Sequence, residues 1–167
     1  NNAGVMLQPN ALMKTSVSDW KWIMDTNFWG SLYGLRVFSG LMFTQPEGGR
    51  IVTTASTAGV SAFSGWAPYS VTKTALVRLV ENYQAEAIKF ELDKVKYNVS
   101  LPGVFESEIA NSTLHRNEEY NNINGNGQEI PLSVAHTESG DRLGMLTAEE
   151  TAQIILDQID EGCFYLL

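Results

Sequence analysis

Residues 50–73 read RIVTTASTAGVSAFSGWAPYSVTK and carry three patterns in succession. Residues 50–55 are a short β-branched run, which is typical of a strand buried in a sheet. Residues 56–65 are mostly small and indicate a loop after that strand. From residue 68 to about residue 92 the apolar residues recur at helical spacing. The stretch therefore predicts a strand, a loop at its carboxyl end and a helix.

Further elements of the same kinds lie on both sides of this stretch. The sequence patterns predict two more helices and two more strands, at residues 18–44, 147–161, 97–101 and 163–167. In the last helix, Ile154, Ile155 and Ile159 are expected to face inward. Strands that alternate with helices predict an α/β fold, a parallel sheet with flanking helices and right-handed crossovers.

The composition narrows the classes of function. The 167 residues are 44% apolar and 18% charged, which indicates one globular domain. A net charge of -8 disfavours binding to nucleic acid. No apolar run reaches the roughly 18–20 residues of a membrane span, so we expect a cytoplasmic protein. The single Cys163, with His115 and His136 far apart, predicts no metal site.

Several small or polar residues follow the expected strands. In open parallel sheets, ligands bind beyond the carboxyl ends of the strands. Gly4, Ser56 and the pair Pro102-Gly103 each lie just past such an end. We therefore expect these residues on one rim of the sheet.

Tyr69 and Lys73 stand at i and i+4 near the start of the helix at 68–92 and so share one face. A phenol with a pKa of about 10 exchanges protons poorly at neutral pH, and a neighbouring ammonium lowers that pKa. Ser56 is placed to hydrogen-bond the same reacting oxygen. Taken alone, a Tyr and a Lys four residues apart are more often the edge of an amphipathic helix.

Five separated features, in this order and spacing, resemble the classical branch of the short-chain dehydrogenase/reductase family. They are Asn1-Asn2-Ala3-Gly4, Asn27, Ser56, Tyr69-Ser70-Val71-Thr72-Lys73 and Pro102-Gly103. The resemblance covers essentially the whole chain. It implies a Rossmann-like parallel sheet of which residues 1–167 are the C-terminal portion, with the N-terminal βαβαβα portion absent. It also implies an oxidoreductase that uses NAD or NADP to interconvert a secondary alcohol and a ketone or aldehyde.

The resemblance implies a catalytic tetrad of Asn27, Ser56, Tyr69 and Lys73. Tyr69 would be the general acid in carbonyl reduction and the general base in alcohol oxidation. Ser56 would orient the reacting oxygen, and Lys73 would lower the tyrosine pKa and hold the nicotinamide ribose. Asn27 would support a water that links Lys73 to solvent. The alternative for Asn27 is that it satisfies an irregular stretch of local backbone.

The resemblance implies two further groups of cofactor contacts, beside Tyr69 and Lys73. The adenine-ribose side would be lined by Asn2, Ala3 and Gly4, where small residues allow close approach of the backbone. The nicotinamide carboxamide would lie along Pro102, Gly103 and the backbone of Phe105. Ser107 stands where the family usually has threonine, so the hydroxyl is kept.

Residues 106–144 are rich in asparagine and show little apolar periodicity, so we expect a long loop. This stretch matches the variable substrate-binding region of the family. Four apolar residues are candidates for the walls of a pocket for a hydrophobic alcohol or carbonyl compound: Phe63, Trp66, Ile109 and Leu114. The alternative is that each is an ordinary core or surface residue.

Two expectations concern assembly. The helices at 18–44 and 68–92 resemble the pair through which family members form homodimers and homotetramers; packing on the sheet is the alternative. A second hypothesis for the whole chain is a non-catalytic fragment, or a binding or assembly module. A thermal shift with NADH or NADPH separates this hypothesis from an enzyme.

Overall fold

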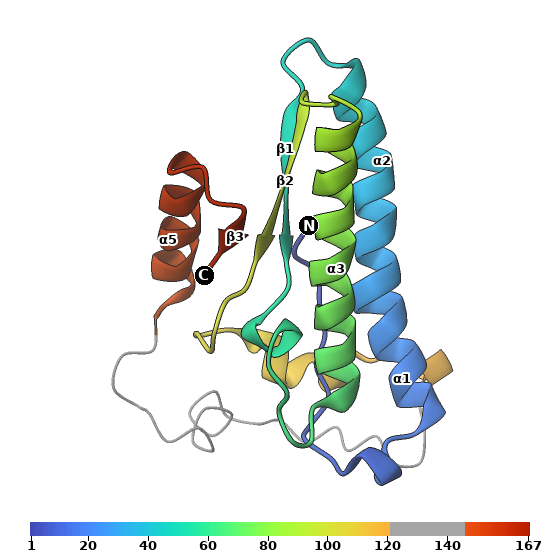
Figure 1. The fold of residues 1–167 in the computed structure, drawn as a ribbon. Coiled ribbons are helices and arrows are strands. Elements are labelled where there is room, and N and C mark those ends of the chain that lie inside the picture. The colour runs from blue at the N-terminus through green and yellow to red at the C-terminus, as the bar shows by residue number, and fades with distance from the viewer. Residues whose placement is uncertain (121–145) are drawn as a thin grey trace.

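The computed structural model describes residues 1–120 and 146–167 (Figure 1). Three strands form a parallel sheet in the order β1-β2-β3, namely Gly49–Thr54, Val95–Ser100 and Tyr165–Leu166. The β1 to β2 register runs from Gly49 opposite Val95 to Thr54 opposite Ser100. The predicted parallel sheet is confirmed, with strand bounds that shift by one or two residues.

The first predicted helix is one long rod with an irregular centre. It consists of α1 (Val17–Ile23), a π-helical turn (Met24–Trp29) and α2 (Gly30–Thr44). The rod begins with a capping box, because the Asp19 amide donates to the Ser16 hydroxyl and the Ser16 amide donates to the Asp19 carboxylate. The helix at 18–44 is confirmed, whereas its π-helical turn was not predicted.

The remaining helices also follow the sequence patterns. The later α-helices are α3 (Ala67–Lys89) and α5 (Ala148–Asp160), and the short 3-10 helices are Leu12–Lys14, Thr57–Gly59, Glu108–His115 and Glu118–Tyr120. Thr147 caps α5, and its amide in turn donates to Glu150. The prediction of a loop is wrong for the two 3-10 helices after residue 107, and residues 121–145 lie outside the described residues.

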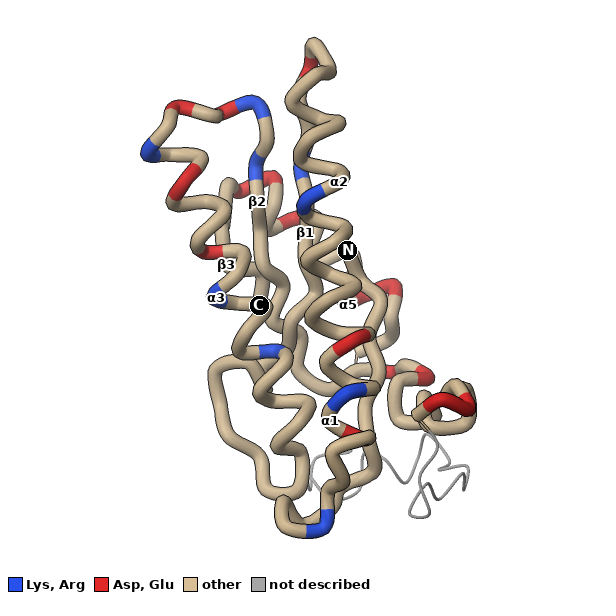
Figure 2. Tube along the Cα trace, turned by 90° about the vertical axis from the view of Figure 1, so that its right-hand side faces the viewer, with Lys and Arg blue, Asp and Glu red and all other residues tan. Residues whose placement is uncertain are grey.

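The main core lies between the sheet and the pair α2 and α3, which cover the same face (Figure 1). Leu35 of α2 and Leu76 of α3 meet Ile51, Tyr97 and Val99 of the strands, and all five are buried. Charged residues in β1 and β2 stand only near their amino ends, at Arg50 and Lys96 (Figure 2). The carboxyl ends of the strands are therefore free of charged side chains.

Helix α5 lies on the opposite face of the sheet from α3 (Figure 1). Side chains alternate along a strand, so Ser100 points away from the face that Tyr97 and Val99 share with Leu76. Ser100 instead lines a hollow with Thr151 of α5. One crossover joins β1 to β2 through α3, and the other joins β2 to β3 through α5. In the strand order β1-β2-β3 both crossovers move across the sheet in the same direction. Because their helices lie on opposite faces of the sheet, the two crossovers have opposite hands. The prediction of right-handed crossovers is therefore wrong for one of them.

The isoleucines of α5 are less buried than the sequence pattern predicted. Ile154 is 37% exposed, and Ile155 and Ile159 are only half-buried. No residue of α5 is buried, because α5 reaches mainly β3 among the described elements. The predicted inward direction is met by Ile154 and Ile155, which line the hollow between α5 and the end of β2, although neither is fully buried.

Candidate active site

Tyr69 and Ser56 meet at the carboxyl end of the sheet. Tyr69 lies in the first turn of α3, where Pro68 fits because early helical positions need no backbone donor. Ser56 follows β1, and its hydroxyl accepts a hydrogen bond from the Ala58 amide at 3.1 Å. The hydroxyl also hydrogen-bonds the Tyr69 phenol. The residues at the end of one strand and the start of the next helix thus form a pair of hydroxyl groups.

Lys73 lies one helical turn after Tyr69 and is only 2% exposed. Its Nζ lies 5.5 Å from the centre of the Tyr69 ring and donates to the carbonyl oxygen of Thr54 at 2.8 Å. Burial lowers the pKa of Lys73 to about 8, because a low-dielectric environment disfavours the ammonium. At neutral pH the side chain is still mostly charged.

The pKa of Tyr69 differs from the expectation. Burial raises it, and the hydrogen bond from Ser56 lowers it by a smaller amount. The net shift is upward because burial outweighs the lowering, and the role of Lys73 toward this pKa stays a prediction. The physical reason for the upward shift is that Tyr69 is only 8% exposed, and burial disfavours the charged phenolate. The phenol of Tyr69 is thus protonated at neutral pH.

Asn27 is fully buried in the π-helical turn. Its Oδ1 accepts from the Val5 amide at 2.7 Å, and its Nδ2 donates to the Val5 carbonyl at 2.9 Å. The same Nδ2 donates to Thr72 Oγ1 at 3.1 Å, and Thr72 donates to the Tyr69 carbonyl at 2.7 Å. Both N–H groups of Asn27 are thus used to hold the extended N-terminal segment and α3 together. These partners are far from Asn27 in the sequence, so the bonds are not those of the local-backbone alternative, and the role of Asn27 toward a water stays a prediction.

The segment at residues 1–4 passes directly over these side chains. A Cβ atom on Gly4 would lie 3.5 Å from both Asn27 Oδ1 and Lys73 Nζ, so the glycine backbone lies close to them. Asn1 is held along β1, where the Thr54 amide donates to its carbonyl at 3.0 Å. Asn2 and Ala3 are exposed. Gly4 and the end of β1 therefore lie on one rim, as predicted.

Pro102 joins the same rim. Its carbonyl oxygen accepts from the Thr57 amide at 3.1 Å and from the Ser56 hydroxyl at 3.5 Å. Gly103 is exposed, and a Cβ there would meet nothing within 4 Å, so space is open beside it. Ser107 is half-buried in extended backbone before the 3-10 helix Glu108–His115. The three strand-end segments thus meet, with Ser107 further along the chain.

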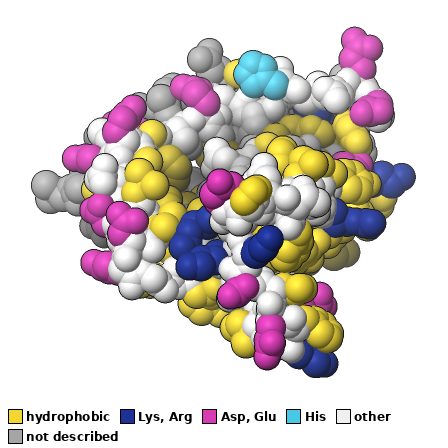
Figure 3. Space-filling model, turned by 90° about the horizontal axis from the view of Figure 1, so that it is seen from above, with side chains coloured by type: hydrophobic (Ala, Val, Ile, Leu, Met, Phe, Trp, Pro, Cys, Tyr) yellow, Lys and Arg dark blue, Asp and Glu magenta, His cyan; other side chains and the backbone are white. Residues whose placement is uncertain are grey.

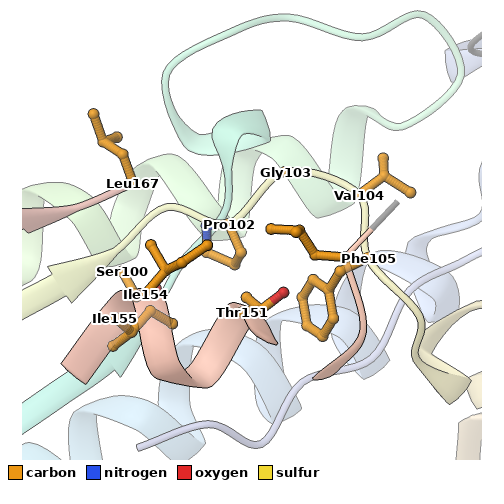
Figure 4. Close-up of a pocket in the computed structure, with 10 residues that line it drawn as sticks. Ser100, Pro102, Gly103, Val104, Phe105, Thr151, Ile154, Ile155 and Leu167 are labelled. Atoms are coloured by element: carbon orange, nitrogen blue, oxygen red, sulfur yellow. The ribbon is translucent and has the colours of Figure 1, made fainter. Parts of the chain in front are cut away.

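Phe105 points elsewhere. It forms a bridge with Leu146 and lines a hollow of about 170 Å³ between the end of β2 and α5. Figure 4 shows Pro102 and Phe105 facing Thr151 and Ile154 across this hollow. Its lining is mostly apolar. The hollow is separate from the Tyr69 phenol, because it lies on the face of the sheet opposite α3.

An apolar cluster surrounds Tyr69, and we call it the Tyr69 cluster. Its buried members are Ile23, Ala58 and Tyr69, and its half-buried members are Val5, Met6, Leu7, Trp66 and Ile109. Trp66 packs edge-on against the Tyr69 ring, with 6.3 Å between the ring centres, and the ring centres of Phe63 and Trp66 are 5.8 Å apart. Of the predicted wall residues, Trp66 and Ile109 lie beside Tyr69, and Phe63 lies one contact away. Leu114 is 42% exposed and outside the cluster.

Two residues of the site were missed by the sequence reasoning. Thr72 is fully buried and links Asn27 to Tyr69. Its position three residues after Tyr69, on the inward face of α3, is a signal that could have identified it. The Thr54 carbonyl that accepts from Lys73 is a backbone group, so its side chain gives no signal.

Among residues 1–120 and 146–167 no group of three His, Cys, Asp or Glu side chains is arranged to hold a metal ion. Within the same ranges, none of the helices is both long and apolar enough to cross a membrane.

The fold and site define a parallel α/β domain with a serine, a tyrosine and a lysine at the carboxyl ends of its strands. The model of the short chain dehydrogenase family matches residues 1–118. The chain therefore belongs to the short chain dehydrogenase family, as the resemblance implied.

Two curated relatives illustrate the match. A C alpha-dehydrogenase of Sphingobium sp. strain SYK-6 is 28% identical over 167 residues, which is 100% of this chain and 52% of that protein. The 3beta-hydroxysteroid dehydrogenase 2 of Eggerthella lenta is 33% identical over 111 residues, which is 65% of this chain and 41% of that protein. The chain spans about half the length of these relatives.

Solved structures agree with the fold. A short chain dehydrogenase/reductase from Burkholderia phymatum in complex with NAD has a TM-score of 0.84 and 29% identity, and the match covers 99% of this chain and 58% of that one. ElxO with NADP bound has a TM-score of 0.59 and 28% identity over 69% of this chain and 45% of that one. The Rossmann-like sheet with flanking helices is thereby confirmed.

Proposed function

We propose that this chain is the catalytic portion of an NAD(P)-dependent oxidoreductase that interconverts a secondary alcohol and a ketone or aldehyde. The observation that carries the proposal is the Tyr69 phenol, hydrogen-bonded to Ser56 and within 5.5 Å of the Lys73 ammonium in an apolar cluster. A buried phenol beside a second hydroxyl can donate a proton to a carbonyl oxygen, because both groups converge on one point.

Each member of the proposed tetrad has a distinct task. Tyr69 donates the proton in reduction and accepts it in oxidation, and Ser56 orients the reacting oxygen by a hydrogen bond. Lys73 supplies a positive charge that favours the phenolate form when the proton leaves. Asn27 holds Val5 and Thr72, and through them the segment that covers Lys73.

The residues fit a nicotinamide dinucleotide, which supplies or accepts the hydride when bound. Gly4 brings backbone close to Lys73, and open space lies beside Gly103. The residues proposed to hold the cofactor are Asn2, Ala3, Gly4, Tyr69, Lys73, Pro102, Gly103, Phe105 and Ser107. The NAD and NADP complexes of the two related structures support either cofactor.

The proposed substrate is a hydrophobic alcohol or carbonyl compound. The half-buried members of the Tyr69 cluster are apolar, and they leave a hydrophobic surface beside the phenol. Apolar walls with a few convergent polar groups are typical of small-molecule sites. Residues 106–144 are proposed to complete this substrate region.

The test is Tyr69→Phe in the intact enzyme. This change removes only the phenolic oxygen, so we expect turnover to fall by about 10²–10⁴-fold while the unfolding temperature stays close to that of the parent. Tyr83→Phe, a half-buried tyrosine of the same helix, is the control and should keep full activity. Persistent turnover in Tyr69→Phe would sink the role given to Tyr69.

The alternative function is a non-catalytic fragment or a binding or assembly module. The length ratio to the relatives is the observation that favours it, since the chain spans 52% and 41% of two of them. Adding NADH and NADPH separately and following thermal unfolding decides between the two. An upward shift supports the enzyme, and no shift at high concentration supports the alternative.

We also propose a homodimer or homotetramer that forms through α2. The outer face of α2 and of the π-helical turn before it carries a ridge of exposed apolar residues at four-residue spacing: Trp29, Tyr33, Val37 and Leu41, each between 42% and 60% exposed. Seen from above, hydrophobic side chains gather over α2 and α3, whereas acidic ones gather over α5 (Figure 3). An exposed apolar ridge of this kind is typical of an interface between subunits.

A further inference from the structure

Residues 108–120 are fastened to the rest of the molecule at two places. At the first, Ser112 Oγ accepts from the Met6 amide at 2.9 Å, and the Gln8 side chain donates to the Ala110 carbonyl at 3.4 Å. These bonds lie next to Ile109, which packs in the Tyr69 cluster. The start of this segment is thus part of the apolar wall beside the phenol.

The second place is a buried ion pair. The Arg116 guanidinium contacts the Asp19 carboxylate at 2.5 Å, with side chains only 4% and 12% exposed. The guanidinium also lies over the Trp22 ring, 5.0 Å from its centre, and donates to Ser18 Oγ at 3.4 Å. Removing one partner of a buried ion pair leaves an uncompensated charge, so this contact holds the segment more firmly than a surface pair would.

The C-terminal end of the segment 108–120 is also bonded to α1, which carries Asp19 and Trp22, and to the π-helical turn that follows it. The Ser18 hydroxyl donates to the Tyr120 carbonyl, and the Tyr120 hydroxyl donates to Asp25, both at 2.8 Å. Figure 1 shows the segment, in yellow to orange, beside α1. Helix α1 also carries Ile23, a buried member of the Tyr69 cluster. The same helix therefore supports both the anchor and the wall.

We propose that Arg116 is a positioning residue. Through Asp19 and Trp22 it fixes residues 108–120, so that Ile109 is held against the Tyr69 cluster and limits the size of the carbonyl compound that reaches the phenol. The effect on substrate size rests on the proposed function. The anchoring of residues 108–120 by Arg116 does not depend on it. Arg116 takes no part in proton transfer, because its guanidinium is occupied by α1.

The test uses the intact enzyme with Arg116→Met, which keeps an unbranched stem and loses the charge. Amide hydrogen exchange in residues 108–120 should become at least about tenfold faster, because the segment loses its anchor. The KM ratio for propiophenone against butanone should change at least about threefold, whereas the KM for the nicotinamide cofactor and the pH profile of kcat should not change. Arg116→Lys should restore part of the protection.

Two controls make the result decisive. Arg78→Met removes an arginine from an exposed pair with Glu81 and should leave exchange in residues 108–120 unchanged. If Arg116→Met fails to fold, Asp19→Asn breaks the same pair from the other side. Unchanged exchange in both variants overturns the anchor. Faster exchange with an unchanged KM ratio overturns the effect on substrate size. If the parent reduces neither ketone, the proposed function fails, and the exchange result alone decides the anchor.

Discussion

Lys73 is a charged residue in a position that disfavours its charge. Burial lowers its pKa from 10.5 to about 8, and the Thr54 carbonyl gives the ammonium one strong acceptor. The protein holds it one helical turn from Tyr69, where a positive charge assists loss of the phenolic proton. The cost of this arrangement is measurable as a dependence of stability on pH.

Between pH 8 and 10.5 the unfolded chain binds more protons at this lysine than the folded chain does. Stability therefore rises with pH through this window. The free energy of unfolding of the parent, relative to Lys73→Met, should increase by up to about 3 kcal/mol from pH 8 to 10.5. Urea unfolding at several pH values measures it, with Lys89→Met as a control for loss of a lysine from the same helix. A flat difference contradicts the prediction.

The pKa of Tyr69 is shifted upward, whereas that of Lys73 is shifted downward, and this shift also leads to a prediction. Burial raises its pKa, so the phenol stays protonated at neutral pH, which suits reduction. Alcohol oxidation needs the phenolate, and its kcat/KM should rise with pH above neutral. Ser56→Ala removes the hydrogen bond that lowers the pKa and should shift this rise to higher pH. An unshifted profile, or one that moves to lower pH, would argue against Ser56 as the partner of Tyr69.

At the scale of elements, the site depends on how closely the 3-10 helix Thr57–Gly59 approaches α3. A Cβ on Gly59 would lie 2.8 Å from the carbonyl oxygen of Lys73 and 3.0 Å from Val77 Cγ2. Any side chain at this position must push the two elements apart. The contact between Ser56 and Tyr69 therefore requires a glycine here.

Gly59→Ala should lower the free energy of unfolding by about 1–3 kcal/mol, because the backbone of α3 must move. It should also reduce turnover, since Ser56 moves away from Tyr69. Gly40→Ala is the control: a Cβ there meets nothing within 4 Å, and an exposed helical position favours alanine. Chemical denaturation and steady-state kinetics measure both. Equal stability of the two variants would show that the approach is not tight.

Periodicity predicted most of these elements, and the site residues that followed from it are the ones placed on a strand end or a helix face. The spacing of Tyr69 and Lys73 was enough to bring them together. The π-helical turn around Asn27 was not predictable, because apolar residues recur at ordinary helical spacing on both sides of it. Arg116 gave no signal either: its partner Asp19 is distant in sequence, and only the tertiary fold joins them. The opposite face taken by α5 is likewise a property of the long connection between β2 and β3.

At the scale of the whole molecule, the ridge on α2 sets the expected assembly. Val37 is 58% exposed at the middle of this ridge. A glutamate there would place a charge in an apolar interface, where desolvation is costly. Val37→Glu should therefore yield a smaller particle than the parent in light scattering at two protein concentrations. Val60→Glu, at an equally exposed position outside the ridge, should keep the parent mass. Equal masses for all three would exclude an interface at this ridge.

The molecule contains two units that we expect to form at different stages of folding: β1, α3 and β2 make up the first, and α5 and β3 the second. β1 and β2 share six residue pairs, and α3, which lies between them in the sequence, packs on β2. β3 joins the sheet through only two pairs, Val99 with Tyr165 and Ser100 with Leu166, after a long chain closure. We therefore expect the β1-α3-β2 unit to form first and the α5-β3 unit to dock last and to undock first. Amide protons of residues 148–166 should exchange through partial opening, while those of β1 and β2 exchange only when the whole molecule unfolds.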